Sequence, residues 1–249
     1  MKLHGFAMSP NTKRAMLGLE EAGLVYEHVP VDLMSGEHKG EAYRGLNPTA
    51  RVPTLVDGDF HLWESNAILE YAAALAPGKR LGGENPREKA EIARWMFMGA
   101  AHLSPNVARI FAHTIRLPED QRNPKIVEDA RTEVDRCLVA LDMRLQKHEC
   151  LVGDRVTIAD LSILPALANA GCCASTSRGS RAWSRGWSGS WRAPRGRRRT
   201  GSHSSAGGSS GALASKVRGL SPVSSSHVRG SSGEASAPRF CRTGFEVSG

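Results

Sequence analysis

The composition of this 249-residue chain changes abruptly near Gly171, and the change limits where a folded core can form. Residues 1–170 carry 20 basic and 23 acidic side chains, whereas residues 171–249 carry 13 basic and 2 acidic ones. The last 79 residues include 20 Ser and 14 Gly, and no Ile, Met, Asp or Tyr. Such a segment cannot bury enough apolar surface to offset its chain entropy. We therefore predict a folded part over 1–170 and a disordered basic tail over 171–249.

Cysteine usage and hydropathy exclude several classes of protein. The five cysteines form no regular framework, and none lies in the first 136 residues. The sequence has no Cys-x-x-Cys pair and no zinc-ligand spacing, which argues against structural disulfides and a bound metal. No apolar run approaches the roughly 18 to 20 residues that span a bilayer, and the start of the chain lacks a signal-peptide pattern. We expect a cytoplasmic protein with no metal and no membrane partner.

The first 76 residues read as a small α/β domain. Lys2–Phe6 is predicted as a strand, a helix follows from Pro10 to the stop at Gly23, and Val25–Val31 is a second strand. This β-α-β opening implies a parallel pair joined by a right-handed crossover. A short helix over 35–46, a hairpin around Asp57-Gly58 and a helix capped by Ser65 follow. This order of elements predicts a four-stranded mixed sheet covered by helices.

The second half reads as all-helical. After a Gly-rich linker over 79–84, Asn85 and Pro86 begin a helix whose apolar stripe runs until Pro105. A longer helix is predicted from Pro124 to 145. Thr157 and Asp160 then form a capping-box pattern before a last apolar stretch that ends at 170. The loss of strand signals predicts that residues 85–170 form a separate, helical domain.

The turn between the first strand and the first helix is the natural place for chemistry. Ser9 precedes Pro10 there, and a helix N-terminus offers unpaired N–H groups and a partial positive charge. The sequence holds no Ser-His-Asp spacing and no nucleophile elbow that would activate the hydroxyl for attack. Ser9 suits hydrogen bonding to an anion, and it equally suits the role of a helix cap alone.

Residues 1–170 resemble the cytosolic glutathione transferases, especially the serine-type phi and theta-like classes. Each matching segment is weak by itself, but their order and spacing together are specific. They are Gly5-Phe6-Ala7-Met8-Ser9-Pro10-Asn11-Thr12-Lys13-Arg14, Asp32-Leu33-Met34-Ser35-Gly36-Glu37-His38-Lys39, Asn47-Pro48 through Val52-Pro53, Glu64-Ser65, and Thr157-Ile158-Ala159-Asp160.

The resemblance implies a fold, a reaction and a set of binding residues. The fold would be a thioredoxin-like domain over 1–78 and an all-α helical domain over 85–170, in a homodimer that uses glutathione as co-substrate. Ser9 would be the catalytic residue that stabilises the glutathione thiolate for attack on small electrophiles. The residues implied to bind the tripeptide are His38 and Lys39 at its glycine carboxylate, Val52 before a cis Pro53 at its cysteinyl part, and Glu64 and Ser65 at its γ-glutamyl end.

The tail departs from the resemblance, because the family continues into further helices that complete the helical domain. A frame change near Gly171 would explain an incomplete domain followed by unrelated sequence. In that case a glutathione-binding protein without turnover is an alternative to an active transferase. A third alternative is a nucleic-acid-binding tail, since Arg195 and Arg197 to Arg199 lie near Trp183, Trp187 and Trp191.

Overall fold

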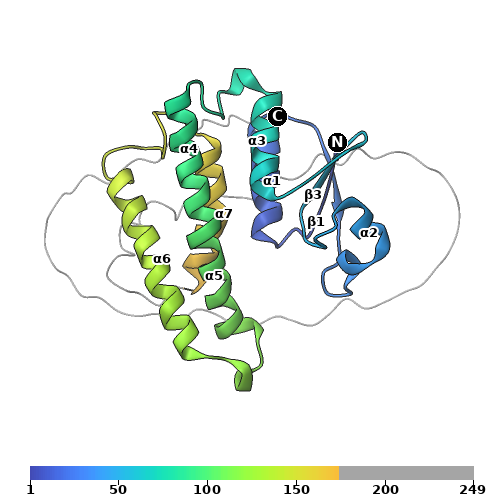
Figure 1. The fold of residues 1–249 in the computed structure, drawn as a ribbon, viewed down its shortest axis with the longest axis vertical. Coiled ribbons are helices and arrows are strands. Elements are labelled where there is room, and N and C mark those ends of the chain that lie inside the picture. Colours follow the sequence, from blue (N-terminus) through green and yellow to red (C-terminus); the bar gives the residue numbers. More distant parts are fainter. Residues whose placement is uncertain (174–249) are drawn as a thin grey trace, which may run out of the picture. The chain divides into compact units, whose positions relative to one another are not determined.

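The computed structural model describes the backbone of residues 1–173 and the side chains of 1–169 (Figure 1). The disorder, the frame change and the nucleic-acid alternative predicted for the tail concern residues 171–249, of which only the backbone of 171–173 is described. The prediction of disorder is wrong for these three residues, because their backbone is helical. None of the described helices is long and apolar enough to cross a membrane.

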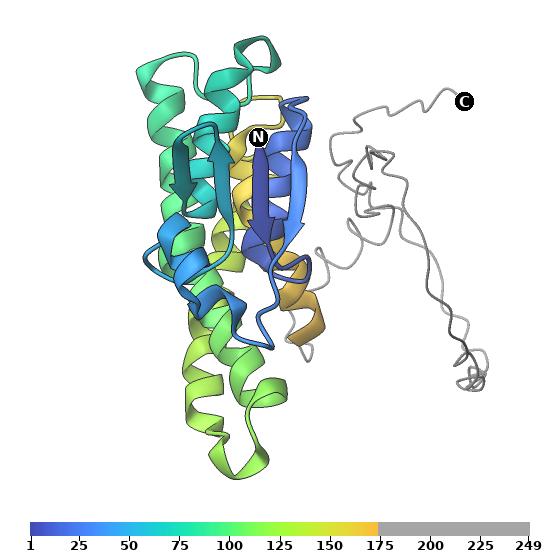
Figure 2. The ribbon, with the colours of Figure 1, turned by 90° about the vertical axis from the view of Figure 1, so that its right-hand side faces the viewer.

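The first half of the chain is built on one four-stranded sheet with the strand order β2-β1-β3-β4 (Figure 2). β1 pairs with β2 in parallel and with β3 in antiparallel orientation, and β3 and β4 form the predicted hairpin. Helices α1 and α3 lie on one side of the sheet and α2 on the other (Figure 1). The predicted mixed sheet is confirmed. The elements are β1 (Lys2–Gly5), α1 (Pro10–Glu21), β2 (Glu27–Pro30), η1 (Glu37–Lys39), α2 (Glu41–Leu46), β3 (Thr54–Asp57), β4 (Phe60–Trp63), α3 (Ser65–Leu75) and η2 (Pro77–Lys79).

The core of this half forms where the sheet meets α1 and α3. Leu3 and Leu55 are register partners on neighbouring strands, and both are fully buried. Gly18 lets α1 approach α3 closely, because a Cβ at this position would lie 2.4 Å from Leu69 Cδ2. A larger residue at Gly18 would therefore force the fully buried Leu69 side chain to move.

The second half is helical, as predicted, and one boundary in it was predicted wrongly. The helix that begins at Pro86 does not stop before Pro105. It continues through a π-helical turn in which the Ser104 N–H pairs with the Gly99 carbonyl, and Pro105, which has no N–H to donate, directly follows this turn. The elements are α4 (Pro86–Met98), η3 (Gly99–Leu103), α5 (Ser104–Phe111), η4 (Ala112–Arg116), η5 (Glu119–Gln121), α6 (Pro124–Leu145) and α7 (Ile158–Cys173).

Helix α7 joins the two halves. It contacts α1 and α3 of the first half and α4 and α5 of the second. Ile158, Leu161 and Ile163 are buried, in keeping with a helix that is apolar on all sides. The predicted capping pattern begins this helix: Asp160 Oδ2 accepts hydrogen bonds from the Thr157 N–H and hydroxyl at 2.9 and 3.1 Å, and Asp160 Oδ1 accepts one from the Leu151 N–H at 2.9 Å.

Arg155, which lies between α6 and α7, connects the linker to the start of α4 through an ion pair with Glu88. The Arg155 guanidinium donates to both carboxylate oxygens of Glu88, at 2.9 and 3.3 Å, and to the Arg80 carbonyl at 3.0 Å. The hydrogen bonds from Arg155 lower the pKa of Glu88 to about 2. The carboxylate therefore stays charged down to acidic pH.

We expect Glu88→Gln to lower the thermal midpoint of unfolding by a few degrees near neutral pH. A carboxylate with a depressed pKa stabilises the fold fully above the unfolded-state pKa, about 4.3, and loses that effect as the pH falls toward 2. Thermal scans of both proteins between pH 7 and 2.5 should therefore converge at the acidic end. Glu91→Gln, which removes an exposed pair with Arg94, is the control and should change the midpoint less. A constant gap between Glu88→Gln and the parent across this range would contradict the expectation.

Candidate functional site

Three turns that carry predicted site residues meet at one end of the sheet. β1 leads into the turn that holds Ser9, and its neighbour β3 begins just after Val52-Pro53, because His4 pairs with Thr54. Thr54 in turn pairs with Trp63 on β4, so Glu64 follows at the same end. Antiparallel pairing thus places the end of β1, the start of β3 and the end of β4 side by side.

Ser9 is the N-cap of α1. Its backbone is extended, with φ −67° and ψ 128°, and its Oγ accepts a long hydrogen bond from the Thr12 N–H at 3.5 Å. Pro10 occupies the first helical position, and the first turn carries no acidic residue. The partial positive charge of this helix end is therefore not neutralised by its own first turn, and the half-buried hydroxyl lies beside it.

The peptide bond between Val52 and Pro53 is cis, as predicted. Pro53 is buried and Val52 is half-buried. The preceding residue is held in place, because the Arg51 carbonyl accepts hydrogen bonds from Asn47 Nδ2 at 2.7 Å and from the Tyr43 hydroxyl at 2.8 Å. The backbone around Val52 is thereby fixed against α2.

Glu64 and Ser65 begin α3. Glu64 has φ 69° and ψ 111°, a backbone conformation that is uncommon for a residue with a side chain, and it is exposed. Ser65 is buried, and its hydroxyl accepts a hydrogen bond from Arg14 Nη1 at 2.9 Å. Strained backbone of this kind gathers at binding sites, and here it directs the Glu64 side chain to solvent at the sheet end where Ser9 and Val52 lie.

His38 and Lys39 lie in η1, which follows the loop after β2. Since β2 runs parallel to β1, this loop leaves the sheet at the same end as the Ser9 turn. His38 Nδ1 is buried and has no hydrogen-bond partner within the described part of the chain. Lys39 is exposed. A buried ring nitrogen without a partner is costly, which is consistent with a partner supplied by a ligand.

Arg14, for which the sequence indicated no role, contacts this site through Ser65. Arg14 is 4% exposed, and its guanidinium donates to Asn11 Oδ1 at 2.7 Å, Ser65 Oγ at 2.9 Å, the Ser162 carbonyl at 2.7 Å and Ser104 Oγ at 3.3 Å. Burial lowers its pKa to about 10, opposed by the nearby Glu64 carboxylate. One sequence signal could have identified Arg14 as a buried residue: it lies one turn before Gly18, on the helix face that packs against α3.

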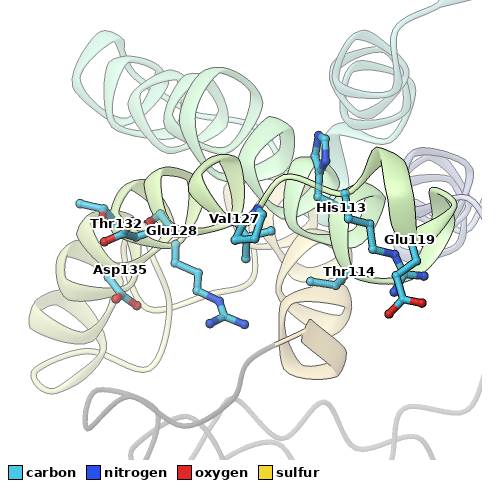
Figure 3. A pocket seen from close by; sticks show the side chains of 10 residues that line it. His113, Thr114, Glu119, Val127, Glu128, Thr132 and Asp135 are labelled. Atoms are coloured by element: carbon cyan, nitrogen blue, oxygen red, sulfur yellow. Dashed lines mark hydrogen bonds between the residues drawn. The ribbon is translucent and has the colours of Figure 1, made fainter.

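A pocket of about 630 Å³ lies in the helical half, where η4 and the following turn face the first half of α6. Figure 3 shows Thr132 and Asp135 on α6 and His113 and Thr114 on η4 around it. The Arg122 guanidinium in the pocket wall is already hydrogen-bonded within the protein, because its Nε donates to the Leu117 carbonyl at 2.9 Å. The pocket contains none of the predicted site residues, and we assign it no role. It is lined by His113, Thr114, Glu119, Arg122, Pro124, Val127, Glu128, Arg131, Thr132 and Asp135.

The cluster at the sheet end contains hydrogen-bond donors, a helix N-terminus and one exposed carboxylate. Within residues 1–169, no group of three or more His, Cys, Asp or Glu side chains is placed to hold a metal ion. The class defined by these features is a two-domain protein in which a thioredoxin-like sheet domain is joined to a helical domain, with a serine at the N-terminus of the first helix and a cis-proline turn at the same end of the sheet.

Comparison with known proteins identifies the family. The model of the glutathione S-transferase N-terminal domain matches residues 1–74, and that of the glutathione S-transferase C-terminal domain matches residues 94–171. The chain therefore belongs to the glutathione S-transferase family and is an enzyme of the transferase class. The predicted family, and a thioredoxin-like domain followed by a helical one, are confirmed.

Individual relatives agree with the family models. Glutathione S-transferase 4 of Zea mays is 34% identical over 164 residues, which cover 65% of this chain and 74% of that protein. A glutathione S-transferase of Hyoscyamus muticus is 33% identical over 171 residues, 67% of this chain and 81% of the relative. The solved theta class glutathione S-transferase of Xanthomonas axonopodis pv. citri, with glutathione bound, is 33% identical with a TM-score of 0.60, covering 65% of this chain and 78% of that one.

Proposed function

We propose that this protein binds glutathione and stabilises its thiolate for attack on small electrophiles. A free thiol has a pKa of about 8.5, so only a few per cent is thiolate at neutral pH. A hydroxyl donating to the sulfur, together with a helix N-terminus, favours the anion. The observation that carries the proposal is the Ser9 hydroxyl at the N-terminus of α1, beside the turns that hold Val52 and Ser65.

We assign residues at the same end of the sheet to each part of the tripeptide. The backbone of Val52, before cis Pro53, would pair with the cysteinyl part. Ser65 and its backbone N–H would bind the γ-glutamyl carboxylate, and Glu64 would bind the ammonium group. His38 and Lys39 would bind the glycine carboxylate, with the unpartnered His38 Nδ1 as supporting evidence.

Turnover of a chloro-nitroaromatic electrophile, measured beside a calorimetric titration with glutathione, tests the proposal. Both binding and turnover are expected. Binding without turnover would select the second candidate, a glutathione-binding protein that has lost catalysis. That candidate is favoured by the C-terminal family match, which ends at residue 171, and by the share of the Zea mays relative that the alignment leaves unmatched.

Further properties belong to the same proposal. We place the glutathione-binding domain at 1–78, the linker at 79–84 and an incomplete helical domain at 85–170, followed by a tail that arose by a frame change. The protein would act as a cytoplasmic homodimer in detoxification. Sequencing the coding DNA tests the frame change, and an intact single frame shared by independent isolates would count against it.

Lys39→Ala is expected to weaken glutathione binding about two- to fivefold, the size of one exposed ion pair. The affinity for γ-glutamylcysteine, which lacks the glycine carboxylate, should stay unchanged. Calorimetric titration of both peptides into the variant and the parent gives the comparison, and Lys147→Ala, at an exposed lysine beyond the end of α6, is the control. Equal losses for the two peptides would place Lys39 away from the glycine end.

A further inference from the structure

Helix α2 is held to the sheet domain by Tyr43 within the helix and by Asn47 at its C-cap, which both donate to the Arg51 carbonyl. The helix has six residues, Glu41–Leu46, and Tyr43 is the buried one among them. Its side chain is 5% exposed. A helix of this length is not stable by itself in water, so its position depends on its tertiary contacts. The contacts of Tyr43 and Asn47 therefore fix the position of α2.

The Tyr43 hydroxyl connects α2 to both sides of the cis-proline turn. It donates to the Arg51 carbonyl at 2.8 Å and is 2.9 Å from Thr54 Oγ1. Because the phenol hydrogen is used on Arg51, the Thr54 hydroxyl is left to donate to the phenol oxygen. Arg51 and Thr54 flank Val52-Pro53, so a single phenol oxygen spans the segment that carries Val52.

We propose that Tyr43 is a positioning residue for glutathione: its hydroxyl couples the η1–α2 segment, which carries His38 and Lys39, to the backbone of Val52. The inference rests on the proposed function, because it assigns both segments to the glutathione site. Tyr43 does not itself touch the tripeptide. It holds two of the binding segments in register, so that the glycine end and the cysteinyl part are bound at once.

The hydroxyl, rather than the ring, carries this role. The buried ring fills the space beneath α2, and phenylalanine would fill it equally. Burial raises the pKa of Tyr43, so the phenol is neutral at physiological pH and acts as a donor. The Arg51 carbonyl keeps its bond from Asn47 Nδ2 at 2.7 Å when the phenol is removed. Removing the hydroxyl therefore loosens the connection to α2 without leaving that carbonyl unpaired.

Tyr43→Phe tests the inference, with Tyr71→Phe as the matched control. Tyr71 lies on α3 and donates its hydroxyl to Asp57 Oδ2, also at 2.8 Å, away from the predicted site residues. Tyr43→Phe should raise the dissociation constant for S-methylglutathione, and the KM for glutathione, about five- to tenfold, the size of one lost hydrogen bond. The kcat at saturating glutathione should change less than about twofold, since the thiolate contact at Ser9 is intact. Tyr71→Phe should change neither constant.

A double-mutant cycle with His38→Ala separates positioning from general destabilisation. If Tyr43 acts through the η1–α2 segment, the two losses in affinity should be less than additive. Additive losses, or an equal loss in Tyr71→Phe, would overturn the inference. Should Tyr43→Phe fail to fold, Thr54→Val takes its place, because it removes the hydroxyl that bonds to the Tyr43 oxygen. Thr54→Val must then raise the KM for glutathione while changing kcat less than about twofold, or the inference fails. Absence of S-methylglutathione binding by the parent protein would instead overturn the proposed function.

Discussion

Ser9→Ala is expected to lower kcat at pH 7 about 10- to 25-fold while changing the affinity for glutathione less than about fivefold. A depression of the thiol pKa by two units corresponds to about 2.7 kcal/mol, the size expected for one charge-assisted hydrogen bond with a helix terminus. Without the hydroxyl, the bound thiol should titrate closer to its free value, so the rate should rise with pH more steeply in the variant. The pH profile of kcat from pH 5.5 to 9 provides the measurement.

Ser9 also caps α1, so the loss of rate must be separated from the loss of a cap. Removing a cap costs about 1 kcal/mol of stability. Asn85→Ala is the matched control, because Asn85 caps α4 with a hydrogen bond from the Glu88 N–H at 3.0 Å and lies outside the predicted site. The control should lose similar stability and keep its rate. An unchanged pH profile in Ser9→Ala would show that the hydroxyl does not contact the sulfur.

Arg14→Met is expected to lower the free energy of unfolding by about 3 kcal/mol, the scale of breaking a buried hydrogen-bond network. The variant removes the hydrogen bond to the Ser162 carbonyl and the contacts that join α1 to α3, α5 and α7. Arg14→Lys should recover part of the loss, since an ammonium group keeps the charge but does not match the planar arrangement of four acceptors. Urea unfolding measures each value.

Arg94→Met provides the comparison for Arg14. Arg94 lies on α4, is exposed and pairs with Glu91 at 2.7 Å, so its loss should cost less than about 0.5 kcal/mol. If Arg14→Met and Arg94→Met lowered the free energy of unfolding by similar amounts, the Arg14 network would not hold the two halves together. The glutathione affinity of Arg14→Lys should also fall, because Ser65 loses the guanidinium that orients its hydroxyl.

Sequence signals that act over a few residues correctly predicted most of the order of helices and strands. Asn85 with Pro86, Asp57-Gly58 and the Thr157–Asp160 pair each form a cap or turn from neighbouring atoms, and each is present in the structure. Pro105 misled the prediction for the same reason: a local rule ends a helix at proline, whereas packing against α6 and α7 favours a continuous helix with a π-helical turn. The roles of Ser9, Val52 and Glu64 stay predictions from the family resemblance.

The amino-acid sequence by itself determined most of the secondary structure, because caps, turns and periodicity are local properties of the chain, and the order of its motifs indicated the family and the residue types at the candidate site. Only the tertiary structure decided that Arg14 bonds to residues from three other helices and that Tyr43 bridges α2 to Arg51 and Thr54. Arg14 and Ser162 are 148 residues apart, and no local pattern encodes such a contact. Long-range hydrogen bonds depend on how buried faces pack, and the packing exists only once the whole chain has folded.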